Sequence, residues 1–142
     1  MPFEFVEHTA DVGLRASGAT VAQALCEAAR GMFATMIDLE SVDPVRRHVV
    51  RCRGDTLEDV LVEWLGSLLA QKDLTGMVFS AFEVDVRVKA DGFVLDGVAR
   101  GERLDRARHR PGTEVKGISY LGLSVRKAES GDGWIAECVL DV

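Results

Sequence analysis

The sequence is poor in the features that mark membrane, secreted and disulfide-rich proteins. In its 142 residues no apolar run approaches the roughly 18–20 residues that a membrane span needs. The first residues also lack the basic region and apolar core of a signal peptide. Its three cysteines, Cys26, Cys52 and Cys138, are scattered among apolar neighbours. We therefore expect no membrane association, a cytoplasmic location, and free buried thiols rather than a disulfide or a cysteine metal site.

The motifs of common enzyme classes are also missing. The sequence contains no P-loop, no dinucleotide-binding glycine pattern, no nucleophile elbow and no zinc-type spacing of cysteine and histidine. No spacing singles out a serine or cysteine that would join a histidine and an aspartate in a nucleophilic triad. We therefore predict no catalytic residue.

Basic residues are fewer than acidic residues, which gives a formal net charge of -6. This balance argues against direct nucleic-acid binding as a general activity, because such proteins use a basic surface to displace counterions from phosphates. Basic residues nevertheless cluster in one segment, at Arg100, Arg103, Arg106, Arg108, His109 and Arg110. Two interpretations stay open for this cluster, a solvated loop and a docking patch for an acidic partner.

The hydrophobic periodicity predicts two helices followed by a run of strands. Alternation indicates strands over 12–16 and 82–89, and further strands are expected over 48–53, 93–100 and 134–139, with a strand or a bent strand pair over 114–127. Thr20 with Gln23, and Asp55 with Glu58, are typical of helix starts. The second helix should end near Lys72, and Asp91-Gly92 suggests a hairpin turn.

These elements predict a single α+β domain over residues 1–142. We expect a mixed, mostly antiparallel sheet with the two helices packed on one of its faces. The apolar stripe of the second helix is interpreted as core rather than as a partner-binding surface. Leu61, Trp64, Leu65 and Leu68 should therefore be buried.

Carboxylates near both ends of the chain form the most informative pattern. Asp11 belongs to Glu7-His8-Thr9-Ala10-Asp11, and Asp141 lies one residue from Val142. Domain termini often lie close together, so the two carboxylates could make an oxygen-rich site for a hard cation. Taken singly, Asp11 could cap a turn, Asp141 could be solvated, and His8 could be structural rather than a base or ligand.

Several segments in order along the chain carry a family resemblance. They are Phe5-Val6-Glu7-His8-Thr9-Ala10-Asp11-Val12-Gly13, the run from Asp55 to Leu65, Val78-Phe79-Ser80-Ala81-Phe82, Gly101-Glu102-Arg103-Leu104-Asp105 with His109, Thr113-Glu114-Val115-Lys116-Gly117-Ile118-Ser119-Tyr120, and the run from Trp134 to Val142. With these segments the whole chain resembles the archease family, small acidic helper proteins of an RNA-splicing ligase. One departure is Leu121, where the family usually has His.

The resemblance implies a protein that catalyses no reaction itself and activates an RtcB-type RNA ligase in tRNA splicing or RNA repair. It implies that the protein promotes guanylylation of the ligase with GTP and restores turnover. The family's metal site maps onto Asp11, Asp141 and a main-chain or terminal oxygen of Val142, and its functional lysine onto Lys116. Oxygen ligands suit calcium, magnesium or manganese rather than zinc.

Three alternatives to this interpretation remain. Lys116 could simply form a surface charge pair with Glu114 on a strand, a contact of little energetic value. The protein could act as a chaperone or as a modulator of tRNA methyltransferases, a role also proposed for the family. A metal-dependent hydrolase would need a base and an open coordination position, and only His8 is near in sequence.

Overall fold

The computed structural model describes residues 2–6 and 11–142. Within these ranges no helix is both long and apolar enough to cross a membrane. In chain order the elements are β1 (Phe3–Val6), β2 (Val12–Gly18), α1 (Val21–Met36), the 3-10 helix η1 (Leu39–Ser41), β3 (Arg46–Gly54), α2 (Leu57–Thr75), β4 (Met77–Lys89), β5 (Gly92–Arg103), α3 (Arg106–His109), β6 (Gly117–Lys127) and β7 (Trp134–Asp141).

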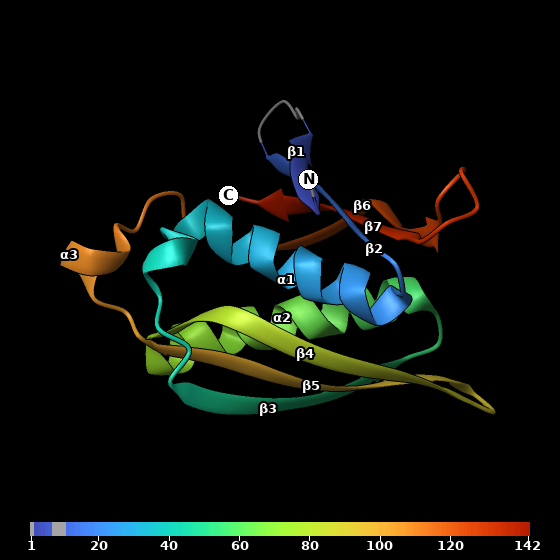
Figure 1. The fold of residues 1–142 in the computed structure, drawn as a ribbon, viewed down its shortest axis with the longest axis horizontal. Coiled ribbons are helices and arrows are strands. Elements are labelled where there is room, and N and C mark those ends of the chain that lie inside the picture. Colours follow the sequence, from blue (N-terminus) through green and yellow to red (C-terminus); the bar gives the residue numbers. More distant parts are fainter. Residues whose placement is uncertain (1, 7–10) are drawn as a thin grey trace.

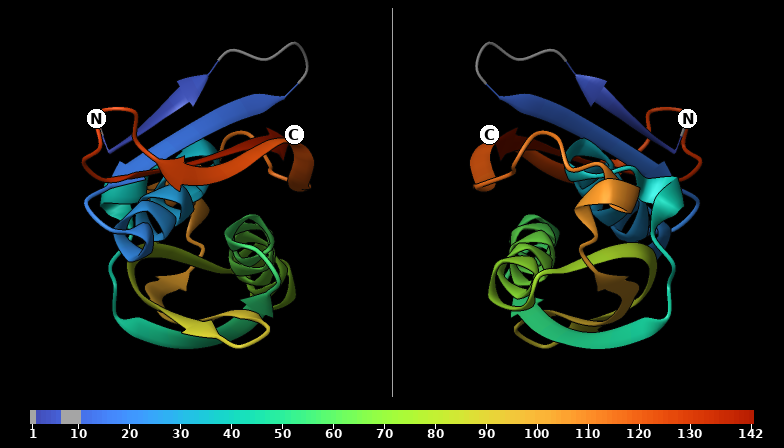
Figure 2. Two further views of the ribbon diagram at one scale, coloured as in Figure 1. Left: turned by 90° about the vertical axis from the view of Figure 1, so that its right-hand side faces the viewer. Right: turned by 90° about the vertical axis from the view of Figure 1, so that its left-hand side faces the viewer.

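The strands form two sheets, with strand order β1-β2-β7-β6 in one and β3-β5-β4 in the other. Helices α1 and α2 lie side by side between the sheets and contact both (Figure 1, Figure 2). The predicted α+β class and antiparallel pairing are confirmed. The prediction of one mixed sheet with both helices on one of its faces is corrected. The described strands all pair antiparallel, and they form two sheets with the helices between them. Alternation shows which face of a strand is buried, but it does not show which strand lies next to it.

The predicted start of α1 is confirmed by its capping contacts. The hydroxyl of Thr20 accepts a hydrogen bond from the N–H of Gln23 at 3.1 Å. The side-chain oxygen of Gln23 in turn accepts one from the N–H of Ala19 at 2.9 Å. These contacts satisfy N–H groups that a helix start leaves without a partner inside the helix.

The predicted start of α2 shifts by one residue, and its predicted end shifts by a few. Its cap is Thr56, whose hydroxyl accepts from the N–H of Asp59, and not Asp55. The helix continues past Lys72 and ends at Gly76, which has a φ of 73°. Glycine adopts this left-handed conformation without steric cost, and this residue therefore terminates the helix.

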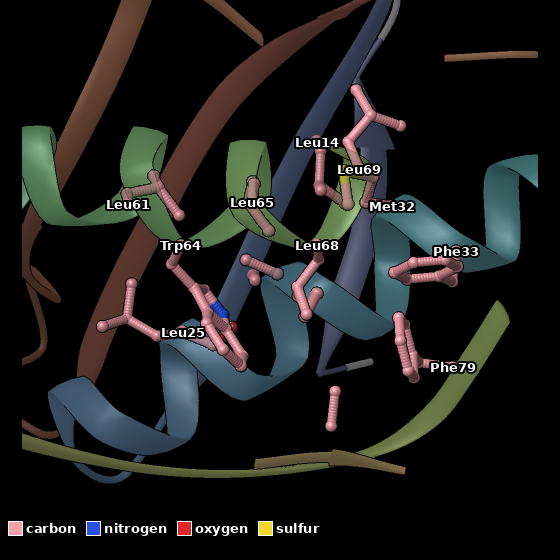
Figure 3. Packing of buried hydrophobic residues seen from close by; sticks show 14 of the residues in the cluster. Leu14, Leu25, Met32, Phe33, Leu61, Trp64, Leu65, Leu68, Leu69 and Phe79 are labelled. Carbon is pink, nitrogen blue, oxygen red and sulfur yellow. Dashed lines mark hydrogen bonds between the residues drawn. The ribbon is translucent and has the colours of Figure 1, made fainter. Parts of the chain in front are cut away.

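The apolar stripe of α2 forms the centre of the core, as predicted. Leu61, Trp64, Leu65 and Leu68 are all 0% exposed. They pack between the sheets against residues of α1, β2 and β4 (Figure 3). The indole of Trp64 also donates a hydrogen bond to the carbonyl of Leu25 at 3.0 Å, which joins the two helices. The stripe is therefore part of the core and not an exposed docking face.

The hairpin between β4 and β5 turns one residue earlier than the sequence suggested. Lys89 pairs with Gly92, so Ala90 and Asp91 form the turn. Gly92 is the first residue of β5, with a φ of 138°. A Cβ at that position would lie 2.5 Å from the carbonyl oxygen of Gly54, so this site requires glycine.

All three cysteines are free thiols, as predicted. Burial is the main cause of the raised pKa values, about 11 for Cys26 and Cys52 and about 12 for Cys138. Thiols with such pKa values stay protonated at neutral pH and are poor nucleophiles or metal ligands.

The basic segment around α3 is partly built into the fold. His109 is 0% exposed, its Nδ1 accepts from the N–H of Asp105 at 2.8 Å, and its Nε2 lies 2.9 Å from Glu102. Arg108 forms ion pairs with Glu102 at 2.7 Å and with Asp43 at 3.4 Å. His109 and Arg108 therefore anchor α3. The interpretation as a solvated loop is wrong for His109, which is buried, while Arg108 stays exposed and is held by its ion pairs.

The Glu102 contacts predict a specific acid dependence of stability. Hydrogen bonds from Arg108, from the N–H of Asp43 and from His109 lower the pKa of Glu102 from 4.5 to about 2. Between these values the unfolded chain binds more protons than the folded one, so this stabilisation is lost as the pH falls from 4.5 towards 2. We expect Glu102→Gln to unfold more easily than the parent above about pH 5, and the difference to shrink towards pH 2.

Urea unfolding midpoints of parent and variant, measured across this pH range, test the prediction. Glu129→Gln, in the exposed turn before β7, is the matched control and should track the parent. A Glu102→Gln defect of the same size at every pH would contradict the assigned role of this carboxylate.

Candidate functional site

The pairing of β2 with β7 brings Asp11 and Asp141 together. The two strands are antiparallel, and their outermost described pair joins Val12 to Leu140. Asp11 directly precedes Val12, and Asp141 directly follows Leu140. In an antiparallel pair these two residues come next in register, opposite each other. The start of β2 and the end of β7 thus meet at one edge of the sheet (Figure 2). Sheet register, rather than the proximity of the two chain termini, is what sets these two residues at facing positions.

The carboxylate of Asp141 lies on the outer face of this sheet, over β6. Leu140 is 0% exposed and points to the helices, so its neighbour Asp141 points away from them. Asp141 pairs with Gly117 of β6, and a Cβ at Gly117 would lie 3.5 Å from Asp141 Oδ2. The carboxylate therefore lies directly beside Gly117, at ordinary contact distance from where a Cβ would stand. Both Asp11 and Asp141 are partly exposed, and solvent ions can reach them.

Lys116 lies at the same edge, at the residue before β6. Its N–H donates a hydrogen bond to the main-chain oxygen of Asp141 at 2.7 Å, and its side chain is exposed. It borders a hollow of about 280 Å³ between α2 and β6, together with Asp73 and Ile118. The alternative charge pair with Glu114 is not found in the part of the chain that the structure describes, because β6 begins only at Gly117.

The remaining predicted site residues are placed as follows. Val142 follows Asp141, and its side chain packs against the core. His8 lies outside the described residues. Within 2–6 and 11–142, no cluster of three or more His, Cys, Asp or Glu side chains has the geometry of a metal site. A cation at Asp11 and Asp141 would therefore need main-chain or terminal oxygens as well, as the prediction for Val142 supposes.

The donor set at this edge fits a hard divalent cation. Its side-chain donors are two carboxylates, and carboxylate oxygens are ligands that calcium and magnesium prefer. Among the described residues neither Asp11 nor Asp141 is neutralised by an ion pair, whereas Glu137 on the same face pairs with Arg15 and Arg126. Two uncompensated like charges at neighbouring positions repel each other, and a cation between them relieves that repulsion.

A bulge interrupts β6, in the segment where the sequence predicted a strand or a bent strand pair. Ser119 pairs with Val139 and Ser124 with Glu137, so the residues between them on β6 face a single residue of β7. Tyr120 and Leu121 protrude there and are 68% and 72% exposed. The only sequence signal is Gly122, which takes a φ of 74° within the bulge. Leu121, the departure from the family pattern, thus lies on the surface in the strand that starts beside Lys116.

The fold and this edge define a class of small α+β proteins with two sheets around a helix pair and an acidic, oxygen-rich sheet edge. The sequence profile of the Archease protein family matches residues 3–142. The chain is 39% identical to Protein archease of Methanopyrus kandleri over 143 residues, covering 100% of both chains. It is 38% identical to Protein archease of Saccharolobus islandicus over 140 residues, covering 99% of this chain and 98% of that one.

A solved structure gives the same result for the fold. The solution structure of Methanobacterium thermoautotrophicum Protein 1598 superimposes with a TM-score of 0.87 at 30% identity, and the match covers 99% of each chain. This chain belongs to the archease family.

Proposed function

We propose that this protein is a non-catalytic, metal-binding activator of an RtcB-type RNA ligase, acting in the cytoplasm in tRNA splicing or RNA repair. In this role it promotes the GTP-dependent guanylylation of the ligase and restores its turnover. The observation that carries the proposal is the juxtaposition of Asp11, Asp141 and Lys116 at one sheet edge of a chain in the archease family.

The physical basis is charge complementarity at a nucleotide site. A ligase that uses GTP and a divalent metal needs a basic, metal-requiring pocket for its phosphates. An acidic edge can enter such a pocket, where Asp11 and Asp141 would share a cation with it or alter its metal occupancy. When bound, the metal supplies positive charge that neutralises phosphate and carboxylate oxygens. Lys116 adds a flexible cation beside the two carboxylates, able to contact a phosphate or an acidic side chain of the partner.

A ligation assay at limiting ligase tests the proposal. We expect multiple turnovers of RNA joining, and faster formation of guanylylated ligase, only when this protein is added. The protein alone should leave RNA and phosphoesters unchanged, which separates activation from hydrolysis. Unchanged ligase turnover, with or without added metal, would contradict the proposal. Stimulation of a tRNA methyltransferase without need of Asp11 or Asp141 would favour the alternative role.

Lys116→Ala is expected to lower ligase stimulation without destabilising the fold. The side chain is exposed and its N–H bond to Asp141 survives the substitution. The free energy of unfolding should therefore change by no more than about 0.5 kcal/mol, as for most surface substitutions. Stimulated turnover and urea unfolding are measured in parallel. Lys89→Ala, at the exposed end of β4, is the control and should stimulate normally; normal stimulation by Lys116→Ala would remove Lys116 from the site.

A further inference from the structure

The arginines of this protein divide into two groups. Eight of them form ion pairs with carboxylates, and these are Arg15, Arg30, Arg51, Arg53, Arg87, Arg100, Arg108 and Arg126. For the other five, no ion pair or side-chain hydrogen bond is found in residues 2–6 and 11–142. These five are Arg46, Arg47, Arg103, Arg106 and Arg110. All five lie at one end of the molecule, where β3 and β4 begin, β5 ends and α3 follows (Figure 1).

Three of these arginines line one hollow of about 320 Å³. Arg46 lies opposite Gly101, and Arg103 lies opposite Met77, so both continue the helix-facing side of their sheet beyond the last turn of α2. Arg47 reaches the same hollow from the start of β3, and His48, Gln71 and Thr75 complete its polar wall. No carboxylate residue lines this hollow.

The arginines are not needed to satisfy the end of α2. The carbonyl of Gln71 accepts from the hydroxyl of Thr75, and that of Lys72 accepts from the N–H of Gly76. The carbonyl of Gly76 accepts from the N–H of Leu104. A helix C-terminus carries about half a negative charge, which is small against the two full charges of Arg46 and Arg103, both on the helix-facing side. The positive charge that lines the hollow is therefore available to bind an anionic ligand from solution.

A second hollow, of about 190 Å³, flanks the same last turn of α2 and the same end of β5. Lys72 and Arg106 line it with positive charge, and Glu114 is its one carboxylate. The Lys72 side chain is only 17% exposed, and the one ion-pair contact it makes among the described residues, to Asp73, is long at 4.0 Å. Two adjacent hollows with five cations and one anion suit a chain of several negative charges better than a single anion.

We propose that these hollows bind the phosphate groups of an oligophosphate, as carried by a nucleoside triphosphate or by the end of an RNA strand. Arginine presents a planar fork of donors that matches phosphate oxygens, and charge-assisted bonds of this kind are strong. The confined size of the hollows and the net charge of -6 favour a short phosphate chain over a long nucleic-acid backbone. Asp11 and Asp141 take no part in this site, which stands whether or not the proposed ligase function does.

The test is a titration of the full chain with inorganic tripolyphosphate, followed by calorimetry and amide NMR shifts, in buffer with EDTA to exclude metal bridging. We expect saturable binding, with shifts at Arg46, Arg103 and the end of α2, that weakens between about 0.05 M and about 0.15 M salt. A nucleoside triphosphate and a short single-stranded RNA, titrated separately, show which carrier of the phosphates binds more tightly.

The double substitution Arg46→Gln with Arg103→Gln should weaken tripolyphosphate binding at least about tenfold, given the strength of charge-assisted bonds. Arg53→Gln, which removes a paired arginine near the hairpin end of the same sheet, is the matched control and should bind as the parent does. Asp141→Ala should also bind normally. Equal binding by the double variant, or tighter binding of an oligoglutamate peptide at the same residues, would overturn the proposal.

Discussion

Asp141→Ala is expected to abolish stimulation of the RNA ligase while the protein stays folded. The side chain lies on the outer, partly exposed face of its sheet and contributes nothing to the core. The main-chain bond that holds Lys116 is kept, because it uses the carbonyl of residue 141. What is lost is half of the carboxylate pair. Loss of a direct ligand should weaken calcium or manganese binding by more than about tenfold, since even residues that only support a ligand have effects of 10–100-fold.

Asp11→Ala should have the same effect, because Asp11 precedes β2 and continues the register of the Val12–Leu140 pair to the position opposite Asp141. Asn at either position keeps an oxygen but loses the charge, and an intermediate defect is expected. Calcium binding is measured by calorimetry, and ligase turnover at limiting ligase. Asp132→Ala, in the exposed turn between β6 and β7, serves as the control and should behave as the parent. Full stimulation by Asp11→Ala or Asp141→Ala would end the proposal that this pair is the site.

The largest loss of stability is expected for Trp64→Ala. The indole is 0% exposed, donates to the carbonyl of Leu25 and packs edge-on against Phe82 with ring centroids 6.1 Å apart. The indole packs directly against the backbone of Gly97, where a Cβ would lie 2.6 Å from the indole Cζ3. Truncation leaves a cavity between both sheets, so the free energy of unfolding should fall by about 3–5 kcal/mol.

Urea unfolding followed by far-ultraviolet circular dichroism measures this loss. The chain has one other tryptophan, Trp134, which is partly exposed on β7 and provides the matched control. We expect Trp134→Ala to cost clearly less, because less apolar area is returned to water. Trp64→Phe should fall between parent and Trp64→Ala. Equal losses for Trp64→Ala and Trp134→Ala would show that the core is not centred on α2.

Local sequence determined the elements and the core of this protein. The apolar stripe on α2 and the alternation in β2 and β4 predicted the buried faces, because side-chain periods of 3.6 and 2 are local properties. The start of α1 followed from Thr20 and Gln23, whose capping contacts span only a few residues. At α2, the sequence indicated Asp55 as the cap, and the folded chain places the cap one residue later, at Thr56.

Tertiary structure decided everything that depends on which strands are neighbours. The division into two sheets and the burial of His109 against Glu102 join segments whose pairing no local pattern records. Five arginines have no ion pair within residues 2–6 and 11–142, and their position at one end likewise depends on where β3, β5 and α3 meet. The sequence by itself, read with its family resemblance, predicted that Asp11 and Asp141 form one site. Only the register of β2 with β7 sets these two positions opposite each other, because cross-strand distances follow from pairing and not from separation along the chain.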